Sequence, residues 1–348
     1  MPEIFRKRQA ALRRGIDFSR ARCLEIGALT TPVLTREECQ VLYADRVDTE
    51  GLLRQFAWDP AVTPDNLAPV DVVWLDRPLK DCVDGSFDLI VASHVGEHVP
   101  DLIGWLAEAS EVLSAGGEIR LMLPDARFSF DALRPPTRLA DLLVAWMQKR
   151  RTPDARDILD FALNKVRDSE VRCQDFYEGL SAPGDMTAQF SFEEALDWVR
   201  PALSDPSHYV DVHCWVFTPG HLAELMIPLA RNNVLDLACA GFEETAPPGF
   251  EFGVFFRVEP DVRRRVESWE RMAREAADPL PGSAAARQKE VEPAEESRVL
   301  QDEPSLDSSH WRERLRGLPG MTRLRQSAAW RYTAPVRRRL RWKNVRST

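Results

Sequence analysis

Five short apolar segments, separated by helix-like or turn-like stretches, constrain the fold of this chain most strongly. They occupy residues 22–27, 41–45, 72–76, 87–93 and 118–124. Apolar strands that alternate with helices are typical of a parallel sheet covered on both faces. Ligands of such sheets bind at the carboxyl ends of the strands. The pattern therefore predicts an α/β fold with a ligand site where these segments end.

Helical patterns lie between and after these segments. Apolar residues in 101–113 recur with helical spacing, and the pair Gly116-Gly117 follows where a helix stop is expected. From about 135 to 206 the periodicity is helical again. We therefore expect one helix before the fifth strand and a helical insertion after it.

The sequence after residue 206 predicts a capped helix followed by two strands that form a hairpin. Thr218-Pro219 is typical of a capped helix with proline at its first position, and Pro228 should kink this helix or end it early. Segments 234–244 and 250–258 are strand-like and flank a Pro-Pro-Gly turn. Uniformly parallel strands would not end in a hairpin. We therefore expect a mostly parallel sheet with an antiparallel last strand.

Composition divides the chain into five regions. The linker is rich in Pro, Glu, Ser and Ala and has few large apolar residues, which favours disorder. The regions are an N-terminal extension (1–19), a main domain (20–260), a charged helix (261–277), the linker (278–310) and a basic tail (311–348).

The net charge of −9 combines two opposite parts. Residues 311–348 carry +11, from twelve Lys and Arg residues and one Glu, and the remainder carries −20. An acidic body argues against general nucleic-acid binding by the main domain. The tail is predicted to dock on a partner enzyme such as a glycosyltransferase, or on an anionic membrane surface, unless it is simply a solvated extension. Nucleic acid is the less favoured partner.

The cellular location is predicted from membrane and export signals that the sequence lacks. There is no run of 18 apolar residues, and residues 1–12 lack the apolar stretch of a signal peptide. The six cysteines are scattered without a C-x-x-C pair, which argues against a zinc knuckle and fits reduced thiols. We expect a cytoplasmic protein, or one held peripherally at the inner membrane face.

The ends of the first three apolar segments carry the strongest chemical signal. Gly27 ends the first, where the missing Cβ lets the backbone approach a ligand closely. Asp45 ends the second, the usual position of a carboxylate that accepts hydrogen bonds from ribose hydroxyls. Asp76 ends the third, within reach of an adenine amino group. These residues predict a nucleoside-binding site.

Four segments in order resemble the class I S-adenosylmethionine-dependent methyltransferases: 24–28, 43–45, 87–101 and 112–119. The resemblance implies a three-layer Rossmann-like fold with a seven-stranded, mostly parallel sheet and an antiparallel last strand. It implies S-adenosylmethionine as the cofactor. Its predicted cofactor contacts are Glu25 and Gly27 at the methionine end, Asp45 at the ribose and Asp76 at the adenine, with Ala28 and Ser93 from the same motifs.

The loop after the first segment departs from the family pattern. The family has G-x-G-x-G, whereas residues 27–32 read Gly-Ala-Leu-Thr-Thr-Pro. This argues against a nicotinamide dehydrogenase, because its pyrophosphate requires the second glycine. S-adenosylmethionine has no phosphate and tolerates a less open loop. The departure also leaves open a non-catalytic adaptor that retains the fold and recruits a glycosyltransferase.

Methyl transfer to a hydroxyl benefits from a general base, and histidine suits neutral pH. His94, directly after the fourth segment, and His213, in a polar and aromatic stretch, are the candidate bases. His98, Asp125 and Arg127 are candidate acceptor contacts. Each has a structural alternative, as a helix-start residue, a capping histidine or part of a solvated loop. Nothing in the sequence indicates a metal site.

A second resemblance concerns the acceptor. Segments 124–131 and 213–219 resemble a bacterial methyltransferase subgroup associated with glycosyltransferases, and 328–337 resembles segments of multidomain proteins of cell-surface polysaccharide synthesis. These resemblances imply O-methylation of a saccharide or another small hydroxyl acceptor. Carboxyl or N-methylation of a small metabolite, for which Arg127 would matter, and the adaptor remain the alternatives.

Overall fold

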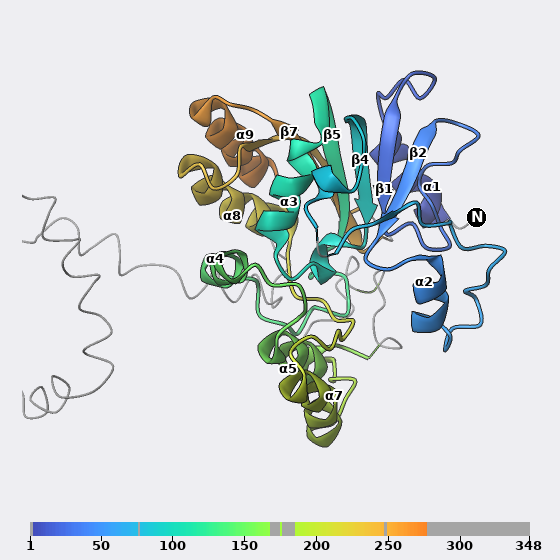
Figure 1. The fold of residues 1–348 in the computed structure, drawn as a ribbon. Coiled ribbons are helices and arrows are strands. Elements are labelled where there is room, and N and C mark those ends of the chain that lie inside the picture. Colours follow the sequence, from blue (N-terminus) through green and yellow to red (C-terminus); the bar gives the residue numbers. More distant parts are fainter. Residues whose placement is uncertain (1–2, 76, 168–174, 176–184, 247–248, 277–348) are drawn as a thin grey trace, which may run out of the picture. The chain divides into compact units, whose positions relative to one another are not determined.

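Seven strands form one mixed sheet in the order β3-β2-β1-β4-β5-β7-β6 (Figure 1). The computed structural model describes residues 3–75, 77–167, 175, 185–246 and 249–276. All neighbouring strands pair in parallel except β7, which runs antiparallel to both β5 and β6. The predicted fold class is confirmed, including the antiparallel last strand. The strands are β1 (Arg22–Ile26), β2 (Gln40–Asp45), β3 (Val72–Val73), β4 (Phe87–Ser93), β5 (Leu113–Pro124), β6 (Leu237–Glu243) and β7 (Glu251–Val258).

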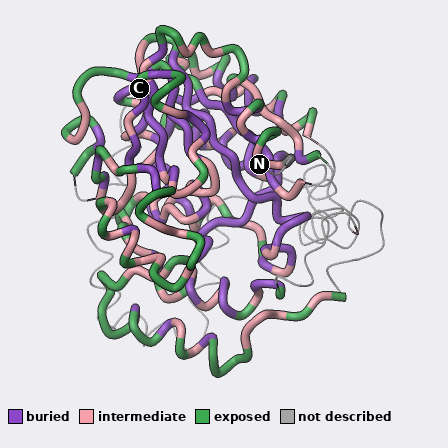
Figure 2. The backbone as a smooth tube through the Cα atoms, turned by 90° about the vertical axis from the view of Figure 1, so that its right-hand side faces the viewer, coloured by how far each residue is buried: buried purple, intermediate pink, exposed green. Residues whose placement is uncertain are grey.

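Helices cover both faces of this sheet. Successive residues of β4 point to opposite faces, so that Ile90 packs with α3, α8 and α9 while Val91 packs with α1. Figure 2 shows the buried residues gathered along the strands. The helices are α1 (Glu3–Arg13), α2 (Thr49–Gln55), α3 (Leu102–Glu111), α4 (Leu139–Gln148), α5 (Ala155–Asn164), α7 (Phe192–Ser204), α8 (Pro219–Arg231) and α9 (Val262–Glu275).

The predicted helical insertion supplies α4, α5 and α7. Helices α5 and α7 pack on each other through a small apolar cluster that includes Phe161 and Val199. The Phe161 ring also lies 5.7 Å from the ring of His213, in the stretch that precedes α8. The insertion therefore lies at the end of the sheet where the parallel strands terminate (Figure 1).

One local prediction was wrong, and one of the two outcomes predicted for Pro228, an early helix end, did not occur. Helix α3 ends at Glu111, and Gly116-Gly117 lies inside β5 rather than closing the helix. A Cβ at Gly117 would lie 2.8 Å from the Phe87 carbonyl oxygen, so glycine is needed there for close strand approach. Helix α8 continues through Pro228 to Arg231, because the buried Leu229 and Ala230 hold its last turn on the core.

The N-terminal residues are part of the folded domain rather than an extension from it. Arg8 on α1 donates to the Glu251 carboxylate on β7, from Nε at 3.1 Å to each oxygen and from Nη2 at 2.6 Å to Oε2. The Arg120 guanidinium on β5 donates to the carbonyl oxygen of Leu12 at 3.0 Å. Residues 3–13 therefore belong with the sheet.

Several predictions fall outside the described residues. They are the disordered linker, the basic tail and its partners, and the adenine contact Asp76. No helix in the part of the chain that the structure describes is long and apolar enough to span a membrane.

Candidate functional site

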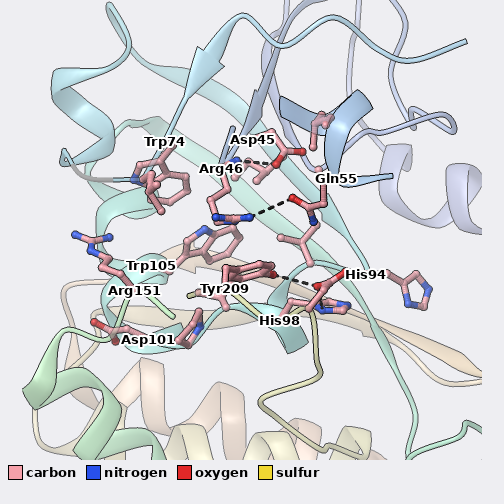
Figure 3. Close-up of a pocket in the computed structure, with 18 of the residues that line it drawn as sticks. Asp45, Arg46, Gln55, Trp74, His94, His98, Asp101, Trp105, Arg151 and Tyr209 are labelled. Atoms are coloured by element: carbon pink, nitrogen blue, oxygen red, sulfur yellow. Dashed lines mark hydrogen bonds and ion pairs between the residues drawn. The ribbon is translucent and has the colours of Figure 1, made fainter. Parts of the chain in front are cut away.

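A cavity of about 360 Å³ opens at the carboxyl ends of β1, β2 and β4 (Figure 3). Helix α2, the turn Gly96–His98, the start of α3 and the segment around Tyr209 form its other walls. Its size is that of small-molecule and cofactor sites. Four of the predicted site residues line it: Gly27, Asp45, His94 and His98.

The loop after β1 approaches the loop after β4 very closely. Gly27 has a φ of +71°, and a Cβ at this position would lie 2.4 Å from Cγ2 of Val95. Leu29 stands where the family pattern has its second glycine, and its φ of +44° lies in the left-handed region that favours glycine. The loop therefore keeps a glycine-like backbone while the Leu29 side chain lines the cavity.

Glu25 faces away from this cavity and holds the loop in place. Its buried carboxylate accepts hydrogen bonds from the backbone N–H groups of Val33, at 2.6 Å, and Leu34, at 2.8 Å. Burial raises its pKa to about 7 against the lowering effect of these bonds. Glu25 does not line the cavity, and neither do Ala28 and Ser93. The structure supports a loop-anchoring role for Glu25 rather than the predicted methionine contact.

Asp45 and the residue after it line the cavity next to helix α2. An Asp45 carboxylate oxygen accepts from the Arg46 N–H at 2.6 Å, and burial raises the pKa of Asp45 to about 6. The Arg46 guanidinium lies 3.6 Å from the ring centroid of Tyr209 and donates to the Gln55 side chain at 3.1 Å. A cationic side chain thus bridges α2 and the segment that carries Tyr209 (Figure 3).

Two tryptophans form a wall that the sequence analysis did not identify. The rings of Trp74 and Trp105 stack at 5.4 Å with an interplanar angle of 18°, and Trp74 Nε1 donates to Glu108 at 2.9 Å. Both line the cavity. Trp74 lies within the apolar segment that ends at Asp76. The sequence does not show which way its side chain points, so Trp74 could not be assigned to the cavity.

His94 lines the cavity but is a poor general base. Its Nε2 lies 2.6 Å from Glu251 Oε2, and its Nδ1 lies 3.3 Å from Glu97 Oε1. Burial alone would lower its pKa, but the two carboxylates outweigh burial and raise the pKa to about 9. Both ring nitrogens of His94 are therefore directed at carboxylates, which disfavours its predicted role as a base.

His213 is buried behind the cavity and does not line it. Its Nδ1 lies 2.7 Å from Asp131 Oδ2, and its ring meets that of His98 edge to face with centroids 4.6 Å apart. His98 does line the cavity, and its Nδ1 lies 3.0 Å from Asp211 Oδ1. His98 therefore connects the cavity with a buried group of acids and imidazoles. His213 does not reach the acceptor directly, so the structure disfavours it as the base.

Asp125 and Arg127 are not acceptor contacts. Asp125 is fully buried, and Arg127 Nη2 donates to Asp125 Oδ2 and to Glu244 Oε1, both at 2.6 Å. The Thr245 hydroxyl donates to the same Asp125 oxygen at 2.6 Å. This charged group joins the end of β5 to the segment after β6. The acceptor role predicted for these two residues was wrong, because their side chains point into the protein.

Comparison with known proteins identifies the family. No curated protein matches the chain. Among solved structures, the CcbJ methyltransferase from Streptomyces caelestis is 14% identical, with a TM-score of 0.36 over 72% of this chain and 88% of that one. An S-adenosylmethionine-dependent methyltransferase from Clostridium acetobutylicum is 10% identical, with a TM-score of 0.34 over 73% and 89%. These scores are low. The family model for a methyltransferase domain, however, matches residues 2–228, well over half of the chain, and the chain therefore belongs to this methyltransferase-domain family.

Proposed function

We propose that this chain transfers a methyl group from S-adenosylmethionine to a hydroxyl group of a small or glycan-linked acceptor. The observation that carries the proposal is the single cavity at the carboxyl ends of the strands. It joins the Gly27 loop and Asp45 at one side to Tyr209, Asp211 and His98 at the other. A cofactor and an acceptor can therefore meet there.

The residues present fit S-adenosylmethionine. Gly27 lets the loop backbone approach the cofactor, and Asp45 can accept hydrogen bonds from ribose hydroxyls. The Trp74 and Trp105 rings offer apolar area to a nucleoside base. When bound, S-adenosylmethionine supplies the methyl group on a positively charged sulfur. The work of this chain is to align the acceptor with that group and to exclude water.

The charges around the cavity favour a hydroxyl acceptor over a carboxylate. Three arginines line it: Arg150 and Arg151 have carboxylate partners, and Arg46 donates to Gln55 and lies over the Tyr209 ring. Arg150 pairs with Asp154 at 2.6 Å and Asp157 at 2.8 Å, and Arg151 lies 3.5 Å from Glu108. A hydroxyl group needs no free cation and can donate to a carboxylate such as Asp211. The resemblance of 124–131 and 213–219 to glycosyltransferase-associated methyltransferases favours a saccharide within this class.

Replacing Asp45 tests the cofactor site. We expect the Asp45→Asn variant to bind S-adenosylmethionine more weakly by a factor of about 10 to 150, the equivalent of about 1.5–3 kcal/mol for a hydrogen bond to a charged group. Isothermal titration calorimetry measures this, with Asp84→Asn, an exposed acid outside the cavity, as the matched control. Unchanged binding by Asp45→Asn would refute the assignment of Asp45 to the ribose. If the unaltered chain bound no S-adenosylmethionine, the proposed methyltransferase activity would be refuted.

The raised pKa of Asp45 predicts a pH dependence of the same binding. Only the ionised carboxylate can accept from both ribose hydroxyls, and the pKa is about 6 in the free protein. Affinity should therefore be constant above this pH and fall by up to about tenfold for each pH unit below it. Arg46 and Asp211 are the charged neighbours that tune this pKa. In Asp45→Asn the decline should disappear; an identical decline in the variant would assign it to another group.

The acceptor class is tested with methyl-labelled cofactor and cell extract. Label in a saccharide fraction supports the proposal, and label in small acids or amines supports carboxyl or N-methylation. Cofactor binding without label in any fraction would leave the adaptor function.

A further inference from the structure

We propose that Glu97, His98 and His213 bind one divalent transition-metal ion directly behind the cofactor cavity. One ligand atom from each of these three side chains lies within 4.8 Å of the others. A carboxylate oxygen and two imidazole nitrogens at this spacing can converge on a single ion. We call these three residues the metal cluster.

Glu97 is the buried acid of the metal cluster, and its oxygens have few partners. It is 1% exposed, and neither carboxylate oxygen has a hydrogen-bond partner among the residues that the structure describes. The nearest basic nitrogens are His94 Nδ1, which lies 3.3 Å from Oε1 without hydrogen-bond geometry, and His213 Nε2, at 4.0 Å from the same oxygen. A buried carboxylate is costly unless it is paired, hydrogen-bonded or coordinated to a metal. The lone pairs of Glu97 are therefore available to an ion.

His213 is held in the orientation of a metal ligand. Its Nδ1 lies 2.7 Å from Asp131 Oδ2, so a proton on Nδ1 can be donated to that carboxylate and Nε2 is left as the acceptor. Asp131 is itself fixed by Arg134, which donates to its other oxygen at 2.9 Å. Histidine ligands of metals almost always donate their second N–H to a carboxylate, a carbonyl or water. Asp131 is such a partner.

The backbone fixes the two halves of the metal cluster together. The N–H groups of Cys214 and Trp215 donate to the Glu97 carbonyl oxygen at 2.7 and 3.2 Å. Trp215 Nε1 donates to the Val99 carbonyl oxygen at 2.6 Å. These bonds dock the stretch that carries His213 onto the turn that carries Glu97 and His98, so the site does not depend on flexible side chains alone.

The ligand set selects the kind of ion. Imidazole suits zinc, iron, nickel and copper, whereas magnesium and calcium prefer oxygen ligands alone. Three protein ligands also leave a coordination position open, as in catalytic zinc sites. His98 lines the cavity as well, so the ion would adjoin the acceptor side. There it could bind an acceptor hydroxyl and lower the hydroxyl pKa. This role rests on the proposed function, whereas metal binding does not.

Metal uptake by the full-length chain tests the site without any activity assay. We expect protein stripped with a chelator and dialysed against Zn²⁺ or Co²⁺ to retain the metal stoichiometrically, with visible Co²⁺ bands. Glu97→Gln and His213→Asn should lose the bound metal. Asp131→Asn should bind about 10- to 100-fold more weakly, as expected for the partner of a histidine ligand.

Two controls keep the outcome clear. Glu108 lines the cavity and His208 is exposed, and both residues lie outside the metal cluster. The variants Glu108→Gln and His208→Asn should therefore retain the metal. If Glu97→Gln fails to fold, X-ray absorption spectroscopy on the zinc-loaded unaltered chain tests the site instead. We expect the spectrum to show two imidazole ligands of the zinc ion and no sulfur ligand. The metal site would be refuted by a lack of metal uptake, by thiolate ligation of the metal, or by full metal uptake in both Glu97→Gln and His213→Asn. Metal uptake without methyl transfer would refute the proposed function and leave the site standing.

Discussion

The Arg127→Met variant is expected to lose about 3–5 kcal/mol of unfolding free energy, because it leaves a buried carboxylate without its cation. Arg127 is 4% exposed and Asp125 is fully buried. The guanidinium donates to both oxygens of Asp125, and Asp125 also accepts from the Thr245 hydroxyl. Removing the cation leaves the buried Asp125 carboxylate without a positively charged partner. Urea denaturation followed by circular dichroism measures the change.

A matched control separates this buried pair from an ordinary surface pair. Arg263 on α9 pairs with Glu267 at 2.7 Å and is almost fully exposed. Arg263→Met should leave the unfolding free energy almost unchanged, because solvent screens this exposed pair. Arg127→Lys keeps the charge and should recover part of the loss. If instead Arg127→Met were as stable as the unaltered chain and raised only the KM for the acceptor, the acceptor role predicted from the sequence would be restored.

The framework of the sheet could be predicted because its strands carry their own signals. The continuous apolar run of β4 and the glycine or acid that ends each of the first three apolar segments are local properties of the sequence. The pair Gly116-Gly117 was misjudged because two glycines after a helical stripe usually mark a stop. Here they meet a different requirement, since Gly116 has a φ of +81° and Gly117 adjoins the Phe87 carbonyl. Only the neighbouring strand reveals that contact.

The same distinction separates the predicted site residues that reach the cavity from those that do not. Gly27, Asp45 and His94 directly follow strands, so the topology alone brings them to the cavity. Asp125 also follows a strand, but its partner Thr245, and Glu244, which pairs with Arg127, come from a segment much later in the chain. No local pattern could show that they turn Asp125 and Arg127 inward.

The metal cluster was missed for a related reason. Glu97 and His98 are adjacent in the sequence, and His213 lies in a different stretch, so their spacing matches no known ligand motif. Backbone hydrogen bonds from Cys214 and Trp215 bring the two stretches together. Tyr209, which stacks on Arg46 at the cavity, was missed in the same way, although it lies just before the polar stretch that the sequence analysis singled out.

The close approach of the two loops predicts a second large effect. Gly27→Ala adds a Cβ at a φ of +71°, at a cost of about 1–2 kcal/mol, and drives it into Val95. Overpacking of this kind costs about 1–3 kcal/mol more, unless the loop moves. Stability should therefore fall by about 2–5 kcal/mol in total. S-adenosylmethionine binding should weaken as well, because the displaced loop forms the cofactor wall.

Gly116 provides the control that separates the two costs. Its φ of +81° is similar, but a Cβ there meets nothing within 4 Å. Gly116→Ala should therefore show the backbone cost alone and leave cofactor affinity unchanged. Adding Val95→Ala to Gly27→Ala should recover the packing cost but not the backbone cost. Equal destabilisation by Gly27→Ala and Gly116→Ala would mean that the loops can separate freely, and the cofactor wall would then not be preformed by the contact between Gly27 and Val95.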